Sequence, residues 1–182
     1  MACDLTKGRK EPCKNSVGGL KAVYFTDFGD YGTVTQTDDE ITDLSGTFTA
    51  FKYKLKGNSS FEQTITASRE NGTTFFEQTL NLTLKKLSKE DNKELKLLAY
   101  GRPHVAVEDY NGNVFIMGLE HGAEVTGGTI VTGAAMGDLS GYTLTLSAQE
   151  LKPANFVSAP TSADPFDGMA SATVTVTEGT NS

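Results

Sequence analysis

The sequence predicts a mainly β fold, in the form of an antiparallel β-sandwich or barrel with one flanking α-helix. Three observations predict it. Short segments alternate apolar and polar residues and are separated by glycine-rich turns. Only one segment has the period of a helix, so the chain lacks the regular succession of strands and helices that builds a parallel sheet. Only 37% of the residues are hydrophobic, and threonine, serine, glycine and asparagine make up the difference.

Length and charge limit the function. The chain has 182 residues, which is enough for one well-buried domain. Its net charge of −7 argues against a basic clamp on nucleic acid, because such a clamp needs lysine and arginine to displace phosphate counterions. The N-terminus has no apolar segment typical of a secretory signal, and no apolar run is long enough to span a membrane. We therefore expect a protein that folds in a cytoplasm.

The first elements follow a polar arm. Residues 1–19 are predicted to form this arm, and residues 20–28 a β-strand. Residues 29–46 are rich in Gly, Thr and Asp, which predicts a long loop with no more than a short pairing segment. The acidic residues of this segment lack the spacing of a calcium loop and are expected to be solvated. They are Asp38, Asp39, Glu40 and Asp43.

Residues 47–56 have a strict alternation. Phe51, Tyr53 and Leu55 are predicted to point to one side. The lysines Lys52, Lys54 and Lys56 are predicted to point to the other. A strand with one charged face is half exposed, and its lysines would protect an edge of the sheet from further pairing.

A long hairpin is predicted from residues 61–68 and 73–86, joined by a turn that contains Asn71-Gly72. The second strand places its leucines on one face. Its other face is polar over the whole length and is expected to meet water or a polar partner. That face carries Glu77, Thr79, Asn81, Thr83 and Lys85.

One helix is predicted at about 88–100. Ser88 is a favourable N-cap, Leu95 and Leu98 lie on one face, and Gly101 is expected to end the helix.

Two further strand pairs and a tail complete the chain. A hairpin at 104–119 turns at Asn111-Gly112, and residues 122–132 and 141–151 form the other pair. Residues 152–169 hold three of the five prolines and are predicted to be linker-like. The alternating segment ATVTVTE after them is expected to add to a sheet edge, either of this chain or of a neighbouring subunit.

Candidate catalytic residues are few. His104 and His121 have the chemistry of a general base, but a surface or turn position explains each of them more simply. Glu120 beside His121 is a weak metal candidate, because two histidines without a third ligand rarely bind a metal. The chain has no nucleophile motif of the G-x-S-x-G type and no phosphate-binding glycine loop. We therefore expect no enzymatic activity and no cofactor.

Two other patterns are weak indications of a metal. The run that starts at Asp109 begins like a calcium loop, but Val114 stands where such a loop needs glycine. Cys3 and Cys13 do not have the spacing of a zinc site and are expected to be reduced thiols in a cytoplasm. The sequence therefore predicts no metal.

The order of the segments resembles that of the tail tube proteins of long-tailed bacteriophages, a group related to the inner tubes of contractile injection systems. The resemblance runs from about Gly18 to Val157. The segments that carry it are LKAVYF, FKYKLKG, the long hairpin SFEQTITASRENGTTFFEQTLNLTLKKL, the helix KEDNKELKLLAYG, VEDYNGNVFIMGLEHG and TGAAMGDLSGYTLTLSAQELKPANFV. These motifs are an ordered set of turns and strands and contain no catalytic signature.

The resemblance implies a structural protein of the virion. Subunits would join through their sheets into a hexameric ring, and rings would stack into the tail tube that conducts DNA to the host cell. The implied partners are other copies of the chain, other tail proteins, and phage DNA that passes through the lumen without specific binding. Assembly would take place in the host cytoplasm, and no membrane is involved.

Under this model the polar face of the long hairpin would line the lumen. The candidate lumen-facing residues are Glu62, Glu77, Thr79, Asn81 and Thr83. Six copies of the chain would carry a charge of about −42, and a negative wall repels the phosphate backbone so that DNA slides.

The predicted organisation is an arm at 1–19, a tail-tube domain at 20–157 and a C-terminal extension at 158–182. The arm, the loop at 29–46 and the extension are the candidates for contacts between rings. No motif in the sequence indicates whether a contractile sheath surrounds the tube.

Three alternatives remain open at this point. The chain has the composition of other virion β-proteins, such as a head decoration protein or a tail-terminator ring. A carbohydrate-binding β-sandwich module is less well supported, because such modules usually stack aromatic residues on sugars and the chain has no tryptophan. In the third alternative the polar face is only the outer surface of a monomer.

Overall fold

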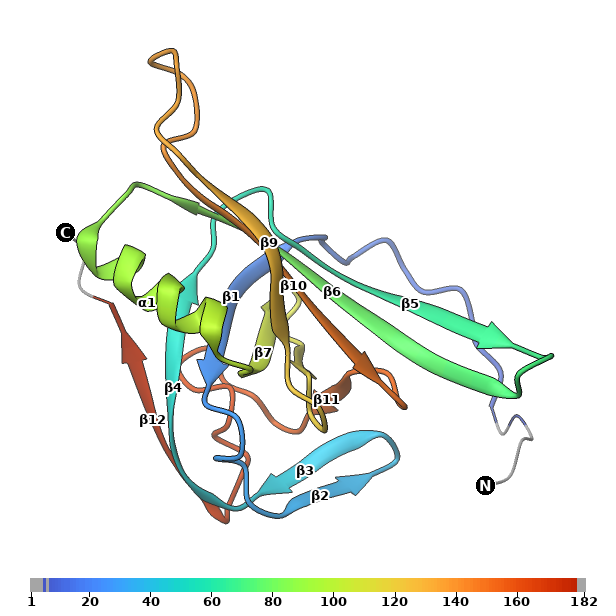
Figure 1. The fold of residues 1–182 in the computed structure, drawn as a ribbon. Coiled ribbons are helices and arrows are strands. Elements are labelled where there is room, and N and C mark those ends of the chain that lie inside the picture. Colours follow the sequence, from blue (N-terminus) through green and yellow to red (C-terminus); the bar gives the residue numbers. More distant parts are fainter. Residues whose placement is uncertain (1–4, 6, 180–182) are drawn as a thin grey trace.

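Two β-sheets and one helix make up the computed structural model of the chain, which describes Leu5 and residues 7–179 (Figure 1). Strands account for 49% of the residues and helix for 7%, and neither sheet closes on itself. The predicted mainly β class with one helix is confirmed.

The larger sheet has eight strands in the order β12-β4-β1-β7-β8-β11-β3-β2. Their bounds are β1 (Leu20–Thr26), β2 (Val34–Thr37), β3 (Glu40–Leu44), β4 (Gly46–Lys54), β7 (His104–Asp109), β8 (Val114–Met117), β11 (Asn155–Val157) and β12 (Ala172–Glu178). The smaller sheet has four strands in the order β5-β6-β10-β9. Their bounds are β5 (Ser60–Ser68), β6 (Thr73–Lys85), β9 (Glu124–Val131) and β10 (Gly141–Glu150).

The expectation of a wholly antiparallel arrangement is wrong at two pairings. Strand β11 runs parallel to β3, and β12 runs parallel to β4 with Ala172 opposite Gly46 and Glu178 opposite Lys52. Both pairings join segments that are far apart in the sequence. An alternating pattern fixes which face a strand buries but contains no information on the direction of a distant partner.

Apolar side chains are buried on both faces of the larger sheet. Val23 and Phe25 of β1 belong to a cluster shared with β6 and β10 of the smaller sheet, whereas Tyr24 belongs to a second cluster on the opposite side. Phe166 and Met169 complete the second cluster and are only 2% and 3% exposed. The segment predicted as linker-like therefore covers the outer side of the larger sheet.

The three predicted hairpins are confirmed, and one additional hairpin appears where a loop was expected. Strands β2 and β3 pair with Thr37 opposite Glu40, so that Asp38 and Asp39 form a two-residue turn. Both have positive φ, 52° and 63°. This is the conformation of a type I′ hairpin turn, which Asp adopts more easily than most residues. Only a short pairing segment was expected here, because this turn lacks the usual Asn-Gly signature of a hairpin.

The predicted helix is α1 (Lys89–Tyr100), and its capping is confirmed. The Ser88 hydroxyl accepts a hydrogen bond from the backbone N–H of Asp91 at 3.0 Å. Gly101 ends the helix, and its N–H donates to the carbonyls of Leu97 and Leu98. Leu95 is buried, and the helix lies beside the smaller sheet near β9 in Figure 1.

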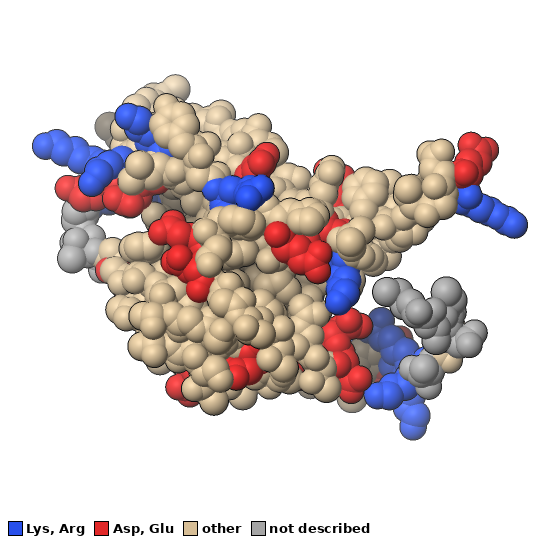
Figure 2. Space-filling view, turned by 60° about the horizontal axis from the view of Figure 1, so that its bottom comes forward, with Lys and Arg blue, Asp and Glu red and all other residues tan. Residues whose placement is uncertain are grey.

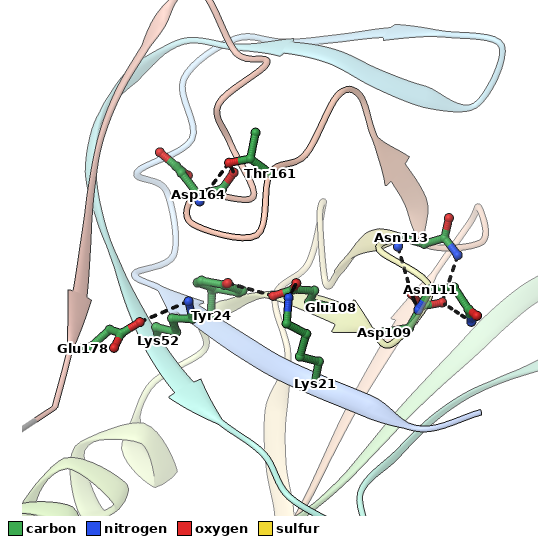
Figure 3. A network of polar contacts seen from close by, with 10 residues as sticks. All are labelled: Lys21, Tyr24, Lys52, Glu108, Asp109, Asn111, Asn113, Thr161, Asp164 and Glu178. Carbon is green, nitrogen blue, oxygen red and sulfur yellow. Dashed lines mark hydrogen bonds and ion pairs between the residues drawn. The ribbon is translucent and has the colours of Figure 1, made fainter. Parts of the chain in front are cut away.

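The lysine-bearing strand is β4, and the expectation that it forms an edge is wrong. Strand β12 covers it on one side and β1 on the other. The Lys52 side chain is only 8% exposed, lies 5.5 Å from the centre of the Tyr24 ring, and pairs with Glu178 of β12 at 3.1 Å (Figure 3). Lys54 pairs with the same carboxylate at 2.7 Å. The lysines that were expected to protect an edge instead bind the strand that covers it.

A buried carboxylate lies next to this ion pair. Glu108 of β7 is 3% exposed, and it accepts hydrogen bonds from the Tyr24 hydroxyl at 2.9 Å and from the Lys21 ammonium (Figure 3). Burial, together with the bond to Glu108, raises the pKa of Tyr24 above its ordinary value. The hydroxyl therefore stays protonated and donates to the carboxylate over the whole physiological pH range.

Candidate functional site: the polar face of the four-stranded sheet

The register of the smaller sheet gathers polar side chains on one face. Thr79 of β6 lies opposite Glu62 of β5 and Ser147 of β10, and Asn81 lies opposite Ser60 and Thr145. Side chains of directly opposed residues share a face. We call this surface the polar face and define it by Ser60, Glu62, Thr64, Glu77, Thr79, Asn81, Thr83, Lys85, Glu124, Thr129, Thr143, Thr145, Ser147 and Gln149. The five residues predicted to share one face are therefore together.

The opposite face of the same sheet is apolar, which fixes the orientation of the polar face. Leu80, Leu82 and Leu146 are at most 1% exposed and pack against the larger sheet, whereas Asn81 is exposed. A shift of one residue in the register would exchange the two faces and bury the hydroxyls. The alternation in β6 therefore determines which side of the sheet is polar.

Hydrogen bonds between neighbouring strands connect several of these side chains. The Thr145 hydroxyl donates to the Asn81 side-chain oxygen at 3.0 Å. The hydroxyls of Thr129 and Thr143 lie 2.6 Å apart. The Thr83 hydroxyl donates at 2.9 Å to the carbonyl of Asn58, which lies in the segment before β5. Such lateral bonds hold short side chains along the sheet and leave a hydrophilic surface.

The charge of the polar face is negative. Its acidic members are Glu62, Glu77 and Glu124, and Glu62 and Glu77 are diagonal neighbours across β5 and β6. Lys85, at the end of β6, is the one cation among the residues that define the face, so the net charge of the set is negative. Figure 2 shows the molecule from the lower side of Figure 1, with acidic groups spread over the body and an acidic and a basic group at the free end of the β5–β6 hairpin.

Both edges of this sheet are uncovered among the residues that the structure describes. Strands β5 and β9 are the first and last strands, so each has one row of backbone groups without a partner in the sheet. Ile65 of β5 is 66% exposed and Ile130 of β9 is 64% exposed. In Figure 1 the β5–β6 hairpin extends well beyond the rest of the sheet. Open edges with exposed isoleucine are typical of strands that pair with another chain.

A tight turn carries the chain from one sheet to the other. This crossing turn, residues 118–122, joins β8 of the larger sheet to β9 of the smaller one. The side-chain oxygen of Gln78 accepts from the N–H of Gly118 at 3.0 Å. One carboxylate oxygen of Glu150 accepts from the N–H groups of Glu120 and His121 at 3.1 and 2.9 Å. Gln78 and Glu150 are only 1% and 5% exposed.

Sequence reasoning missed both of these polar residues. Gln78 and Glu150 occupy positions on β6 and β10 where the alternation calls for apolar side chains. A polar residue in the apolar phase of a strand is the signal that was available, because a buried polar group needs a hydrogen-bonding partner. Here the partners are backbone N–H groups of the crossing turn.

His104 also binds the crossing turn, and its expected surface position is wrong. The ring is 4% exposed and stacks on Tyr31 and Phe28, at centroid distances of 4.4 and 4.9 Å. Its Nδ1 lies 2.7 Å from the Gly118 carbonyl, and its Nε2 accepts from the N–H of Gly29 at 3.3 Å. Burial lowers the pKa of His104 below its ordinary value. The neutral tautomer with hydrogen on Nδ1 satisfies both bonds.

Asp109 organises the turn that was compared with a calcium loop. Its carboxylate accepts from the backbone N–H groups of Asn111 and Asn113, both at 2.8 Å, and from both of their side-chain amides (Figure 3). Burial alone would raise the pKa of Asp109, but these hydrogen bonds lower it below its ordinary value. Asn111 also binds the backbone of Val17 and so ties the arm to the turn.

The remaining sequence-predicted residues are dispersed. Cys13 is exposed, and Cys3 lies outside the described residues. Asp43 binds Ser171, and Asp38 and Asp39 form the β2–β3 turn. Glu120 and His121 are exposed in the crossing turn beside Glu150.

Comparisons of the chain with protein-family models, with curated proteins and with solved structures give no match. In the part of the chain that the structure describes, no helix has the length and apolar character needed to cross a membrane.

Proposed function

We propose that this protein is a subunit of a bacteriophage tail tube, in which hexameric rings stack and DNA passes through the lumen. One observation carries the proposal. The smaller sheet combines a continuous polar face of net negative charge, whose one lysine is Lys85 at the end of β6, with two open edge strands. Pairing of β5 of one copy with β9 of the next would extend this face around a ring. Ring closure would also remove the open edges.

The chemistry of the polar face suits a channel for DNA. Hydroxyl and amide groups hydrate well, and the carboxylates of Glu62 and Glu77 repel phosphate. With Lys85 as the one cation on this face, DNA would find no cluster of cations that holds its backbone. In this proposal the lumen-facing residues are Glu62, Glu77, Thr79, Asn81 and Thr83. The protein has a structural role, and its partners are its own copies, other tail proteins and the DNA that it conducts.

Negative-stain electron microscopy of the purified protein tests the assembly. Long tubes are the expected result. Rings that close without stacking would favour a tail-terminator or similar virion protein, and monomers would contradict the proposal.

A substitution at the open edge tests how the rings form. Ile65→Lys places a charge on an exposed side chain of β5, so it should abolish tubes and leave a folded monomer. Ile65→Val is the matched control and should assemble normally, because it keeps an apolar β-branched side chain. Normal tubes from Ile65→Lys would refute the role given to β5.

Charge reversal tests the lumen. Tubes of the Glu62→Lys/Glu77→Lys variant should retain DNA inside the channel. The control variant Glu90→Lys/Glu94→Lys carries the same change of net charge on helix α1 and should not retain it. Equal retention by both variants would show that the polar face does not meet DNA.

A further inference from the structure

We propose that Glu120, His121 and Glu150 bind a divalent transition-metal ion, with Zn²⁺ as the best-matched ion. The three residues offer two carboxylate oxygens and one imidazole nitrogen, and these atoms lie within 4.8 Å of one another. Sequence reasoning set Glu120 and His121 aside for lack of a third ligand. The fold supplies that ligand from β10, about thirty residues further along the chain.

Glu150 is the fixed member of the group. It is 5% exposed, and one of its oxygens is held by the two backbone N–H groups of the crossing turn. The other oxygen accepts no hydrogen bond from the residues that the structure describes, and it is open to solvent. Because the two backbone bonds fix the carboxylate, this second oxygen can bind a cation without the loss of an existing hydrogen bond. It is therefore positioned in advance as a ligand.

The other two ligands are exposed and adjustable. Each ligand of a tetrahedral zinc ion is about 2.0–2.2 Å from the metal. The three ligand atoms therefore have to lie closer to one another than the 4.8 Å within which they are found in this structure. Glu120 and His121 are exposed, so in this proposal their side chains rotate to close the difference. A small cavity of about 10 Å³ is lined by Glu120 and Glu150, which is roughly the space of one water molecule. A water could thus complete the coordination.

The charges of the three ligands and of the residues around them determine which class of metal ion fits the site. Two carboxylates and a neutral imidazole balance a divalent cation. Lys152 lines the same cavity, but its ammonium is directed to Gln36, to which it donates at 3.3 Å. A nitrogen ligand favours zinc and its neighbours over Mg²⁺ and Ca²⁺, which prefer sites made only of oxygen. The bound ion would join the crossing turn to β10 and so brace the connection between the two sheets.

Calorimetric titration with ZnCl₂ tests the site. The sample is full-length, unassembled protein that has been treated with a chelator and carries Cys3→Ser and Cys13→Ser, so that thiols do not bind zinc. One ion per chain is expected. His121→Ala and Glu120→Gln should each weaken the binding at least tenfold. Glu124→Gln is the control, because it removes an exposed carboxylate of the same region and should leave the affinity unchanged.

Thermal unfolding gives an independent readout. Zn²⁺ should raise the unfolding midpoint of the parent protein and not that of His121→Ala, since an ion that binds only the folded state stabilises it. Glu150→Gln should also lose the effect, provided that its circular dichroism spectrum shows a folded protein. Absence of saturable binding, binding unaffected by His121→Ala, or a preference for Ca²⁺ over Zn²⁺ would each overturn the proposal. None of these results bears on tube formation, which is tested separately.

Discussion

Substitution of Gly118 by alanine should destabilise the protein strongly, because this residue starts the crossing turn. Its φ is +68°, a region that costs an L-residue about 1–2 kcal/mol. A Cβ atom would also lie 2.5 Å from the carbonyl carbon of Gly122 and 2.7 Å from the nitrogen of Ala123. Both are backbone atoms that are unable to rotate away, and overpacking of this kind costs about 1–3 kcal/mol. The expected loss is therefore about 2–5 kcal/mol.

Gly112→Ala is the matched control. Gly112 also has a positive φ, +84°, but a Cβ atom there would meet nothing within 4 Å. Its substitution should cost only the backbone term, about 1–2 kcal/mol. Urea unfolding followed by far-ultraviolet circular dichroism measures both variants, since the chain has no tryptophan for fluorescence. Equal losses for the two variants would refute the close approach within the crossing turn.

Three further predictions concern stability and are checked by the same urea titration. The free energy of unfolding should fall as the pH drops from about 6.5 through the lowered pKa of His104, because the unfolded chain, in which His104 has its ordinary pKa of 6.5, binds the proton more readily. His104→Gln should flatten this pH dependence. An unchanged pH dependence in that variant would contradict the buried, neutral state given to His104. Ser88→Ala removes the cap bond to Asp91 and should cost about 0.5–2 kcal/mol, with no loss being the contrary result. Tyr24→Phe removes a donor to the buried Glu108 carboxylate and should cost about 1–3 kcal/mol; a neutral effect would mean that water replaces the hydroxyl.

The local parts of the fold were predictable because their signals are local. Asn71-Gly72 and Asn111-Gly112 mark hairpins, Ser88 marks the start of the helix, and the alternation in β6 fixes the polar face. Each of these depends on residues close together in the sequence. The same reasoning placed Glu62 on one face with Thr79, because a two-stranded hairpin has few alternative registers once its turn is known.

The parts that could not be predicted depend on distant contacts. Nothing near β12 indicates that it runs parallel to β4, and nothing near Phe166 indicates that it enters the core. The crossing turn is the clearest case. Its partners Gln78, His104 and Glu150 come from three separate strands, and only the folded arrangement brings them to one backbone segment.

The central claim is that the polar face lines a channel, and electron cryo-microscopy of the assembled protein tests it most directly. The account predicts stacked hexameric rings in which β5 of one subunit pairs with β9 of the next, with Glu62, Glu77 and Asn81 facing the lumen. A tube with these residues on its outer wall, or a protein that stays monomeric under all assembly conditions, would contradict it.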